Sequence, residues 1–400
     1  MSTLNMSSIE EALKLYYLPG LRYQLNDQAS ALLAQIEKDS EGVVGKEIRM
    51  AMRYGRVGGI GNRPDDGDLP TPNARQTKQA NWDTKNIFAR FRLTDKTIEA
   101  SKSNVGAFAN MLEQEISDCE TDARLDLSRQ VIGDGEGTLA EVDGAASSAD
   151  PQVVDCDTTM YLAEGMLVDF RDSSGDLTNA AHEGVEIVEV RDETTFAVEQ
   201  TGEEIPDEAK VVISGNVDGS DVYELTGVRK VVDTGGTLYG IDRTENRWLD
   251  AQVDNVNGQI SEVGIQKNID EVETKSGSET DFLMCSKGVA RAYQNLQSAM
   301  KQHVNTLELK GGWTGMSYSG GQKQIALVSD KYVPKGYLFG LDLDDWKMYQ
   351  MADWNWLDRD GSMLTRVANK AAWEATLVKY CDIACQRPRG QFVMEGITEL

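Results

Sequence analysis

The chain has 400 residues, 40% of them hydrophobic, which is enough for two or three domains with a sizeable core. Its formal net charge is −26, with 66 acidic and 40 basic residues, and a field of that sign argues against a reader of nucleic-acid sequence. No run of about 18 apolar residues occurs, so no membrane span is expected. Met1–Glu11 lacks a basic region followed by an apolar one, so no secretory signal is expected either.

The first 45 residues are predicted to form an N-terminal arm. A capping-box pattern at Ser8–Glu11 predicts a short helix that ends at Pro19-Gly20. A second helical run contains Leu25, Leu32, Leu33 and Ile36. About 40 residues bury too little surface to fold alone. Residues 1–45 are therefore expected to be an arm and not a domain.

Residues 46–100 are predicted to form an extended hairpin. Apolar residues alternate with polar ones over Ile48–Tyr54, which predicts a half-exposed strand, and again over Ile87–Leu93, which predicts the return strand. About 30 irregular residues rich in glycine and proline lie between them. A loop of that length usually reaches for a partner. The alternative is a disordered surface loop.

A long helix is predicted over Ser103–Asp134, within residues 101–137. Apolar residues recur there at helical steps, at Val105, Phe108, Leu112, Ile116, Cys119, Ala123, Leu127 and Val131. No proline interrupts the run, and the glycines from Gly133 onward suit a helix end. At about 1.5 Å per residue this gives a rod of about 45 Å. It is either the backbone of a large flat domain or an amphipathic helix of an ordinary core.

The hairpin and the helix carry opposite charge. Residues 46–96 contain 11 basic and 6 acidic residues, a net of +5, and residues 103–136 contain 8 acidic and 2 basic, a net of −6. The hairpin is therefore expected to lie on the helix of a neighbouring copy, where pairs of about 0–1 kcal/mol each matter through repetition. The residues expected at these inter-subunit contacts are Arg56, Arg63, Arg75, Lys78 and Lys85 on one side and Glu113, Asp118 and Asp122 on the other.

An acidic all-β module is predicted over residues 138–235. Residues 138–233 hold 23 acidic and 5 basic residues, a net of −18, so the module is expected to project into solvent. Turn residues separate short β-prone runs at Leu167–Phe170, Val185–Val190, Thr195–Val198, Val211–Ile213 and Val228–Val232. The pattern predicts a small antiparallel barrel or sandwich. No Asp-x-Asp-x-Asp-Gly loop with a following Glu occurs, which argues against a calcium site.

The remaining residues alternate helix and strand. Helices are predicted at Gln259–Val272, Gly288–Gln302 and Lys370–Ala384. Strands are predicted at Asp281–Cys285, Gln324–Val328, Tyr337–Leu343 and Gln391–Met394. The five scattered cysteines are expected to be reduced thiols, with Cys381 and Cys385 as a buried pair one helical turn apart.

No catalytic centre, metal site or cofactor is predicted. The sequence contains no Walker loop, dinucleotide fingerprint or nucleophile elbow, and its two histidines are few for acid–base or zinc chemistry. Tryptophans could form a platform for a sugar or nucleotide, but core or interface anchors are the more typical role. Those considered are Trp346, Trp354, Trp356 and Trp373.

The order of segments resembles the major capsid proteins of tailed bacteriophages, which share the Hong Kong 97-type (Johnson) fold. The resemblance covers nearly the whole chain outside the module. The segments that carry it are Asn86–Thr97, Asp281–Asn295, Gly336–Asp342 followed by Asp344–Trp346, Leu364–Lys370 and Tyr380–Arg389.

The resemblance implies an α+β fold with a defined set of parts. Residues 1–45 would be the N-arm, 46–100 the extended loop, 101–137 the spine helix of the peripheral domain, and 138–235 an inserted domain. Residues 236–256 would return through the peripheral domain, 257–373 would form the axial domain, and 374–400 would return to the subunit core. The insert departs from the simplest family members.

The resemblance also implies a structural function. Copies would form pentamers and hexamers that close an icosahedral virion shell around packaged double-stranded DNA, assembled in the host cytoplasm. Portal, scaffold and decoration proteins would be partners, the DNA would be bound non-specifically, and no membrane would be involved. Covalent cross-linking, known in some members, would need an arm lysine such as Lys78 or Lys85. Two alternatives are an encapsulin-like nanocompartment shell and a carbohydrate-binding or adhesion protein built on the β-module.

Overall fold

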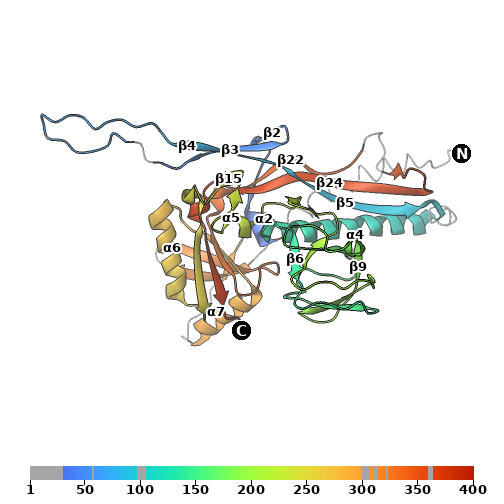
Figure 1. The fold of residues 1–400 in the computed structure, drawn as a ribbon. Helices are drawn as coiled ribbons and strands as arrows, with labels where there is room; N and C mark the ends of the chain where they lie inside the picture. Colours follow the sequence, from blue (N-terminus) through green and yellow to red (C-terminus); the bar gives the residue numbers. More distant parts are fainter. Residues whose placement is uncertain are drawn as a thin grey trace. The chain divides into compact units, whose positions relative to one another are not determined.

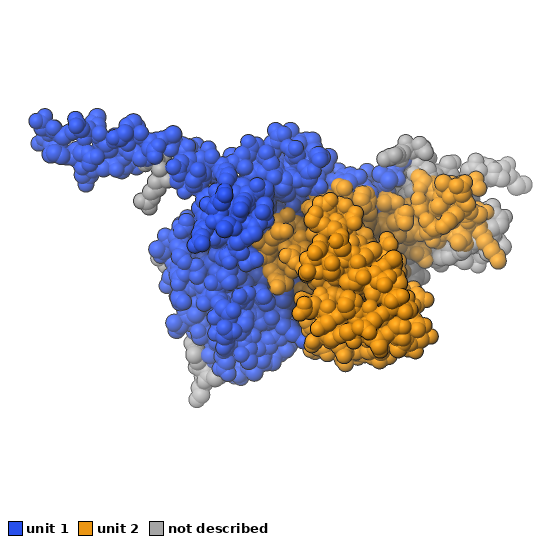
Figure 2. Space-filling view, in the orientation of Figure 1, with its two compact units in different colours: residues 1–84, 231–361, 377–400 blue, residues 85–230, 362–376 orange. Residues whose placement is uncertain are grey.

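The computed structural model describes residues 30–55, 58–96, 105–299, 306–309, 314–320, 323–358 and 364–400. The chain divides into two compact units, drawn in different colours in Figure 2. Unit 1 comprises Met1–Thr84, Val231–Gly361 and Leu377–Leu400, and unit 2 comprises Lys85–Lys230 and Ser362–Thr376. The first predicted N-terminal helix lies outside the described residues, and the second is represented by α2 (Ala31–Gln35).

Unit 1 contains a seven-stranded mixed sheet in the order β16-β25-β21-β17-β20-β19-β18. Its strands are β16 (Gln252–Gly258), β17 (Phe282–Cys285), β18 (Thr306–Glu308), β19 (Thr314–Gly320), β20 (Lys323–Ser329), β21 (Leu338–Leu341) and β25 (Phe392–Ile397). Every side chain of β17 is fully buried, as expected for a central strand. The four strands predicted in this region are confirmed as β17, β20, β21 and β25.

Two helices pack on this sheet through one shared hydrophobic cluster. They are α6 (Glu262–Ser276) and α7 (Lys287–Ala299), which confirm two of the three predicted helices. The Ser261 side chain caps α6 by accepting from the Gly264 amide at 3.0 Å, and Gly277 ends it with a φ of 70°. Figure 1 shows α6 and α7 beside the strands that they cover.

The third predicted helix, Lys370–Ala384, is wrong, because that segment is the long strand β24 (Ala372–Cys385). Nearly all of its side chains are buried or half-buried, so apolar residues occur at almost every position. Periodicity does not separate such a strand from a buried helix. Cys381 and Cys385 are buried as expected, but they lie on a strand and not one helical turn apart.

β24 belongs to a second sheet. In unit 1 it pairs antiparallel with β22 (Trp346–Trp356), which in turn pairs parallel with β1 (Glu37–Asp39). In unit 2 the start of β24 pairs with β23 (Thr365–Arg366), and β5 (Lys85–Thr94) also pairs with β24. The three tryptophans of β22 are 0–2% exposed, which confirms their role as core anchors: they are Trp346, Trp354 and Trp356.

The hairpin of unit 1 is built from β3 (Glu47–Arg53) and β4 (Thr77–Asp83), with the short β2 (Val43–Val44) on the other side of β3. The register runs from Glu47↔Asp83 to Arg53↔Thr77. Ile87–Leu93 is a strand as predicted, within β5, but its prediction as the return strand of the hairpin is wrong, because β3 pairs with β4. The true return strand has only two apolar residues, Ala80 and Trp82, which is too few to predict a strand from alternation.

Unit 2 is organised around α4 (Val105–Ile132), which confirms the predicted long helix. Of the predicted apolar stripe, Ile116, Ala123, Leu127 and Val131 are buried. No helix in the described ranges combines the length and apolar character needed to cross a membrane.

The inserted module of unit 2 is a six-stranded antiparallel sheet in the order β6-β11-β8-β9-β10-β7. Its strands are β6 (Thr138–Glu141), β7 (Gln152–Asp155), β8 (Leu167–Arg171), β9 (Val185–Val190), β10 (Thr195–Val198) and β11 (Lys210–Ile213). A bridge between Val142 and Cys156 joins the ends of the two outer strands and closes the sheet into a small barrel. Phe170 and Phe196 stack 6.5 Å apart in its core.

One strand predicted in the module is wrong. Val228–Val232 instead forms the short helix α5 (Val228–Val231). Val228 and Val231 are both fully buried, and their spacing of three residues matches one helical turn. The other four predicted strands are confirmed, while β6 and β7 were not predicted.

Candidate assembly surfaces

Trp82 of β4 fixes the root of the hairpin to the rest of unit 1. Its indole Nε1 donates to Asp382 Oδ2 at 2.8 Å, and its ring centroid lies 4.2 Å from that of Tyr239. The Tyr239 hydroxyl accepts from the backbone N–H of Cys385 at 2.9 Å, and burial raises the pKa of Tyr239 well above its usual value. These contacts attach the hairpin to β24 through buried, directional bonds. Sequence reasoning missed Trp82, because a single aromatic residue in a polar segment carries no pattern.

The middle of the hairpin makes further contacts within unit 1. Tyr54 stacks on Trp248 with ring centroids 5.0 Å apart and an interplanar angle of 14°. The predicted contact residue Lys78 donates from Nζ to Asn246 Oδ1 at 3.1 Å. Lys78 therefore has a partner inside its own subunit.

The described residues of the hairpin between Tyr54 and Gln76 have no regular structure, and Figure 1 shows a narrow ribbon that continues into a loop. Ile60 and Leu69 in this loop are 91% and 87% exposed; we call them the tip pair. Full burial of one such side chain stabilises by about 1.5–3 kcal/mol, so leaving both in water is costly. In the sequence, Ile60 and Leu69 are two isolated apolar residues among glycines and prolines.

The predicted arginines of the hairpin have different surroundings. Arg63 donates from Nε to the carbonyl of Asp68 at 3.0 Å and so stiffens its own loop. Arg75 is exposed, and Arg56 lies outside the described residues. Lys85 lies on β5 and not on the hairpin, and it donates to the carbonyl of Val222 within unit 2.

The α4 helix presents acidic residues one turn apart. Asp118 and Asp122 are both exposed, and burial together with the charge of Asp118 raises the pKa of Asp122. Glu115 is exposed on the same face, while the side chain of Glu113 lies outside the described part of the helix. Glu115, Asp118 and Asp122 together make this face negative, which suits a basic partner.

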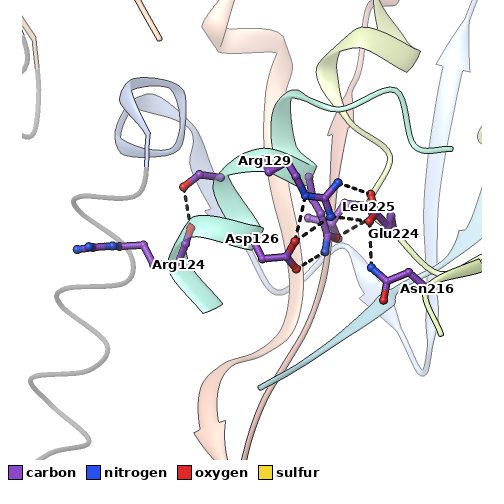
Figure 3. A network of polar contacts seen from close by, with 8 residues as sticks. Arg124, Asp126, Arg129, Asn216, Glu224 and Leu225 are labelled. Atoms are coloured by element: carbon purple, nitrogen blue, oxygen red, sulfur yellow. Dashed lines mark hydrogen bonds and ion pairs between the residues drawn. The ribbon is translucent and has the colours of Figure 1, made fainter. Parts of the chain in front are cut away.

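A buried ion pair fastens the module to α4, as Figure 3 shows. Arg129 donates to Glu224 through NH1 at 3.0 Å and through NH2 at 2.5 Å, and both side chains are less than 10% exposed. NH2 also bonds Asp126 at 2.8 Å. Burial alone favours the neutral guanidine, but the charges of Glu224 and Asp126 outweigh it and raise the pKa of Arg129. Asn216 donates to Glu224 as well, at 3.0 Å.

Further contacts complete this connection. We call Arg129, Asp126 and Glu224, together with the segments that hold them, the clamp. Gln130 donates to Asp126 at 2.7 Å, and its carbonyl oxygen accepts from the Leu225 N–H at 3.3 Å. A Cβ at Gly227 would lie 2.0 Å from the carbonyl oxygen of Gly133, so only glycine fits there. The clamp holds the module on the end of α4.

The chain was compared with known proteins. It matches no protein-family model and no curated protein. Among solved structures it is similar to the capsid asymmetric unit of cyanophage A-1(L), with a TM-score of 0.52 and 12% identity over 92% of this chain and 91% of that chain.

Two further likenesses are weaker. The capsid of a native GTA particle gives a TM-score of 0.46 at 9% identity over 92% of this chain and 90% of that chain. The holo-SrpI encapsulin complex from Synechococcus elongatus gives 0.29 at 16% identity, over 36% of this chain and 53% of that chain. By its likeness to the cyanophage structure, the chain has the α+β fold of tailed-phage capsid proteins, the Hong Kong 97 type.

Proposed function

We propose that the chain is the major capsid protein of a tailed bacteriophage, and that copies of it assemble into the shell of the virion. The observation that carries this proposal is the likeness to a phage capsid subunit over nine-tenths of both chains. The exposed hairpin supports it, because a narrow ribbon with an apolar tip gains its stability from a surface outside itself.

The hairpin is the proposed contact between copies. Burial of the tip pair would contribute about 1.5–3 kcal/mol for each side chain. An exposed ion pair between a hairpin arginine and an α4 carboxylate would contribute about 0–1 kcal/mol. The apolar tip therefore supplies most of the contact energy, and the charges orient the hairpin. A closed symmetric shell repeats this contact in every copy.

The remaining partners follow from the same proposal. The shell would contain double-stranded DNA without reading its sequence, in keeping with a net charge of −26. Portal, scaffold and decoration proteins would complete a virion assembled in the host cytoplasm. The axial domain, over residues 257–373, would meet its copies at the centre of each pentamer and hexamer.

Sedimentation of the purified full-length protein tests the proposal. We expect particles far larger than the 44.1 kDa chain. Particles from infected cells should contain DNA, whereas an enclosed enzyme would identify a nanocompartment shell. A chain that stayed monomeric and bound glycans would instead support an adhesion protein.

The contribution of charge is tested separately. The double variant Arg63→Glu and Arg75→Glu should assemble less well and at lower salt tolerance than the wild type. Arg191→Glu with Lys210→Glu changes two solvent-accessible cations of the barrel by the same total charge and is the matched control. Particles of the double variant with unchanged yield and salt tolerance would show that the hairpin charges take no part in the contact.

A further inference from the structure

Three loops of unit 1 meet at one group of polar side chains. Ser278 lies between α6 and β17, and Asp342 and Asp345 lie between β21 and β22. Arg387 and Gln391 lie between β24 and β25. The loop from β21 to β22 and the loop from β24 to β25 are short. Each connects the seven-stranded sheet with the sheet that contains β22 and β24. The group therefore sits where the two sheets of unit 1 are joined.

The hydroxyl of Ser278 is shared by two carboxyl groups. Its Oγ lies 2.5 Å from Asp342 Oδ2 and 3.2 Å from Asp345 Oδ2. A serine hydroxyl has one proton to donate, so it satisfies one carboxylate and not both. The shorter distance assigns that proton to Asp342. Asp345 then bonds Ser278 only when it carries a proton of its own and donates it to Oγ.

A buried glutamine, Gln391, lies beside both aspartates. Gln391 Oε1 accepts from the Asp342 N–H at 2.8 Å and from Trp346 Nε1 at 3.1 Å. Its amide nitrogen donates to the Arg387 carbonyl at 3.3 Å and lies 3.5 Å from Asp345 Oδ2. Neither Asp342 nor Asp345 is more than 8% exposed, so water does little to separate their charges.

The backbone leaves little freedom at this point. A Cβ at Gly390 would lie 2.5 Å from Ser278 Oγ, so the loops touch at van der Waals distance. Two carboxylates that repel each other cannot separate without moving these loops.

The charged groups around Asp345 are mostly negative. Asp344 and Asp281 add negative charge, and Cys385 is buried beside the group. The positive groups are Arg387, with NH2 3.7 Å from Asp345 Oδ1, and Lys323, which is paired with Glu279. Arg387 is half exposed and makes no close bond to the carboxylate, so it compensates the charge incompletely.

The net electrostatic effect favours a protonated carboxyl at Asp345. Burial is the main cause that raises the pKa of Asp345 to about 6; Arg387 and the hydrogen bond with Ser278 oppose it, and Asp342 and Asp344 add to it. Burial likewise raises the pKa of Asp281 to about 6, and the charges of Asp342 and Asp344 add to that effect.

We propose that Ser278, Asp342 and Asp345 form a proton-operated latch between the two sheets of unit 1. In mildly acidic solution Asp345 is protonated and donates to Ser278 Oγ, while Ser278 donates to Asp342, and this chain of bonds ties the loops together. Loss of the proton breaks the bond from Asp345 to Ser278 and leaves two buried carboxylates facing each other. The junction between the sheets loosens as a result.

The sign of the pH effect follows from the proton count. A raised carboxyl pKa means that the folded state binds more protons than the unfolded state between about pH 4 and pH 6. Unit 1 is therefore most stable at the acidic end of this window and loses stability as the pH rises through it. For Asp345 alone the unfolding equilibrium constant should increase by up to about a hundredfold across the window.

Urea unfolding of the full-length chain, followed by tryptophan fluorescence from pH 4.5 to 8, tests the latch. The wild-type midpoint should fall as the pH rises. Asp345→Asn should show a smaller fall, because the asparagine N–H₂ donates to Ser278 at every pH and only the part due to Asp281 remains. Asp344→Asn removes an equal charge from the same loop without touching Ser278, so it should keep most of the pH dependence.

A second variant tests the sign independently of Asp345. Arg387→Gln removes the opposing positive charge, so the pH at which stability is lost should move upward. Equal flattening by Asp344→Asn and Asp345→Asn would mean that general repulsion operates and not a latch. A flat wild-type profile, or a shift to lower pH with Arg387→Gln, would also overturn the proposal. These measurements concern one subunit and do not depend on shell assembly.

Discussion

The clamp on α4 gives the sharpest test of how unit 2 is held together. Glu224→Ala removes both bonds from Arg129 and one from Asn216, and it leaves the guanidinium with Asp126 as its carboxylate partner in the clamp. Arg129 is 8% exposed, so water does not replace the lost carboxylate. Breaking a buried pair by removing one partner costs about 3–5 kcal/mol. The loss should appear as easier opening of the segment that joins the barrel to α4.

Native-state cleavage by chymotrypsin is a suitable assay, because Tyr223 is half exposed and lies next to Glu224. A loss of about 3 kcal/mol corresponds to an increase of about a hundredfold in the population of the open form. Glu136→Ala is the matched control, since it breaks the exposed pair with Lys210 in the same unit. That pair is worth about 0–1 kcal/mol, so cleavage should rise by less than about fivefold.

The apolar double variant Arg129→Met with Glu224→Leu separates the cost of an unpaired buried charge from the cost of lost packing. Replacing both charges leaves no buried ion without a partner, so stability should return close to that of the wild type. If Glu224→Ala were cleaved no faster than Glu136→Ala, the clamp would not hold the barrel and the reasoning would be refuted.

Three more outcomes are expected. Trp82→Phe should lower the stability of unit 1 by about 1.5–3 kcal/mol, because Asp382 loses a buried donor; a thermal melt of unassembled protein equal to wild type would contradict this. Gly227→Ala should unfold unit 2 locally, since its Cβ would meet the Gly133 carbonyl, and a proteolysis pattern like wild type would rule this out. Replacing both residues of the tip pair with serine should leave the subunit melt unchanged while particle yield falls, as measured by sedimentation; equal yields would remove the tip from the contact.

The long helix could be predicted from the sequence because its burial is one-sided. Ile116, Ala123, Leu127 and Val131 repeat at the spacing of one helix face, and each is buried. The central strands near Phe282 and Leu327 are short apolar runs between turn signals, which is another local pattern.

Other elements depend on contacts distant in the sequence. β24 is covered on both faces, so its residues do not alternate and resemble a helix. β4 is a strand because β3 and Trp82 hold it, and apart from Ala80 and Trp82 its residues are polar. The ion pair of Arg129 with Glu224 joins residues 95 positions apart, a separation that no local pattern reports.

The hairpin charges could be read from composition, but their contacts could not. Lys78 is bonded to Asn246, and Lys85 lies on β5 with a partner in unit 2. Arg63 bonds its own loop, whereas the tip pair is the feature of the hairpin that most needs an outside surface.

Cryo-electron microscopy of the purified full-length protein tests the central claim most directly. The account predicts closed shells of pentamers and hexamers, with density for the hairpin tip on a neighbouring subunit. A monodisperse 44.1 kDa monomer, with the tip pair packed against its own chain, would contradict it.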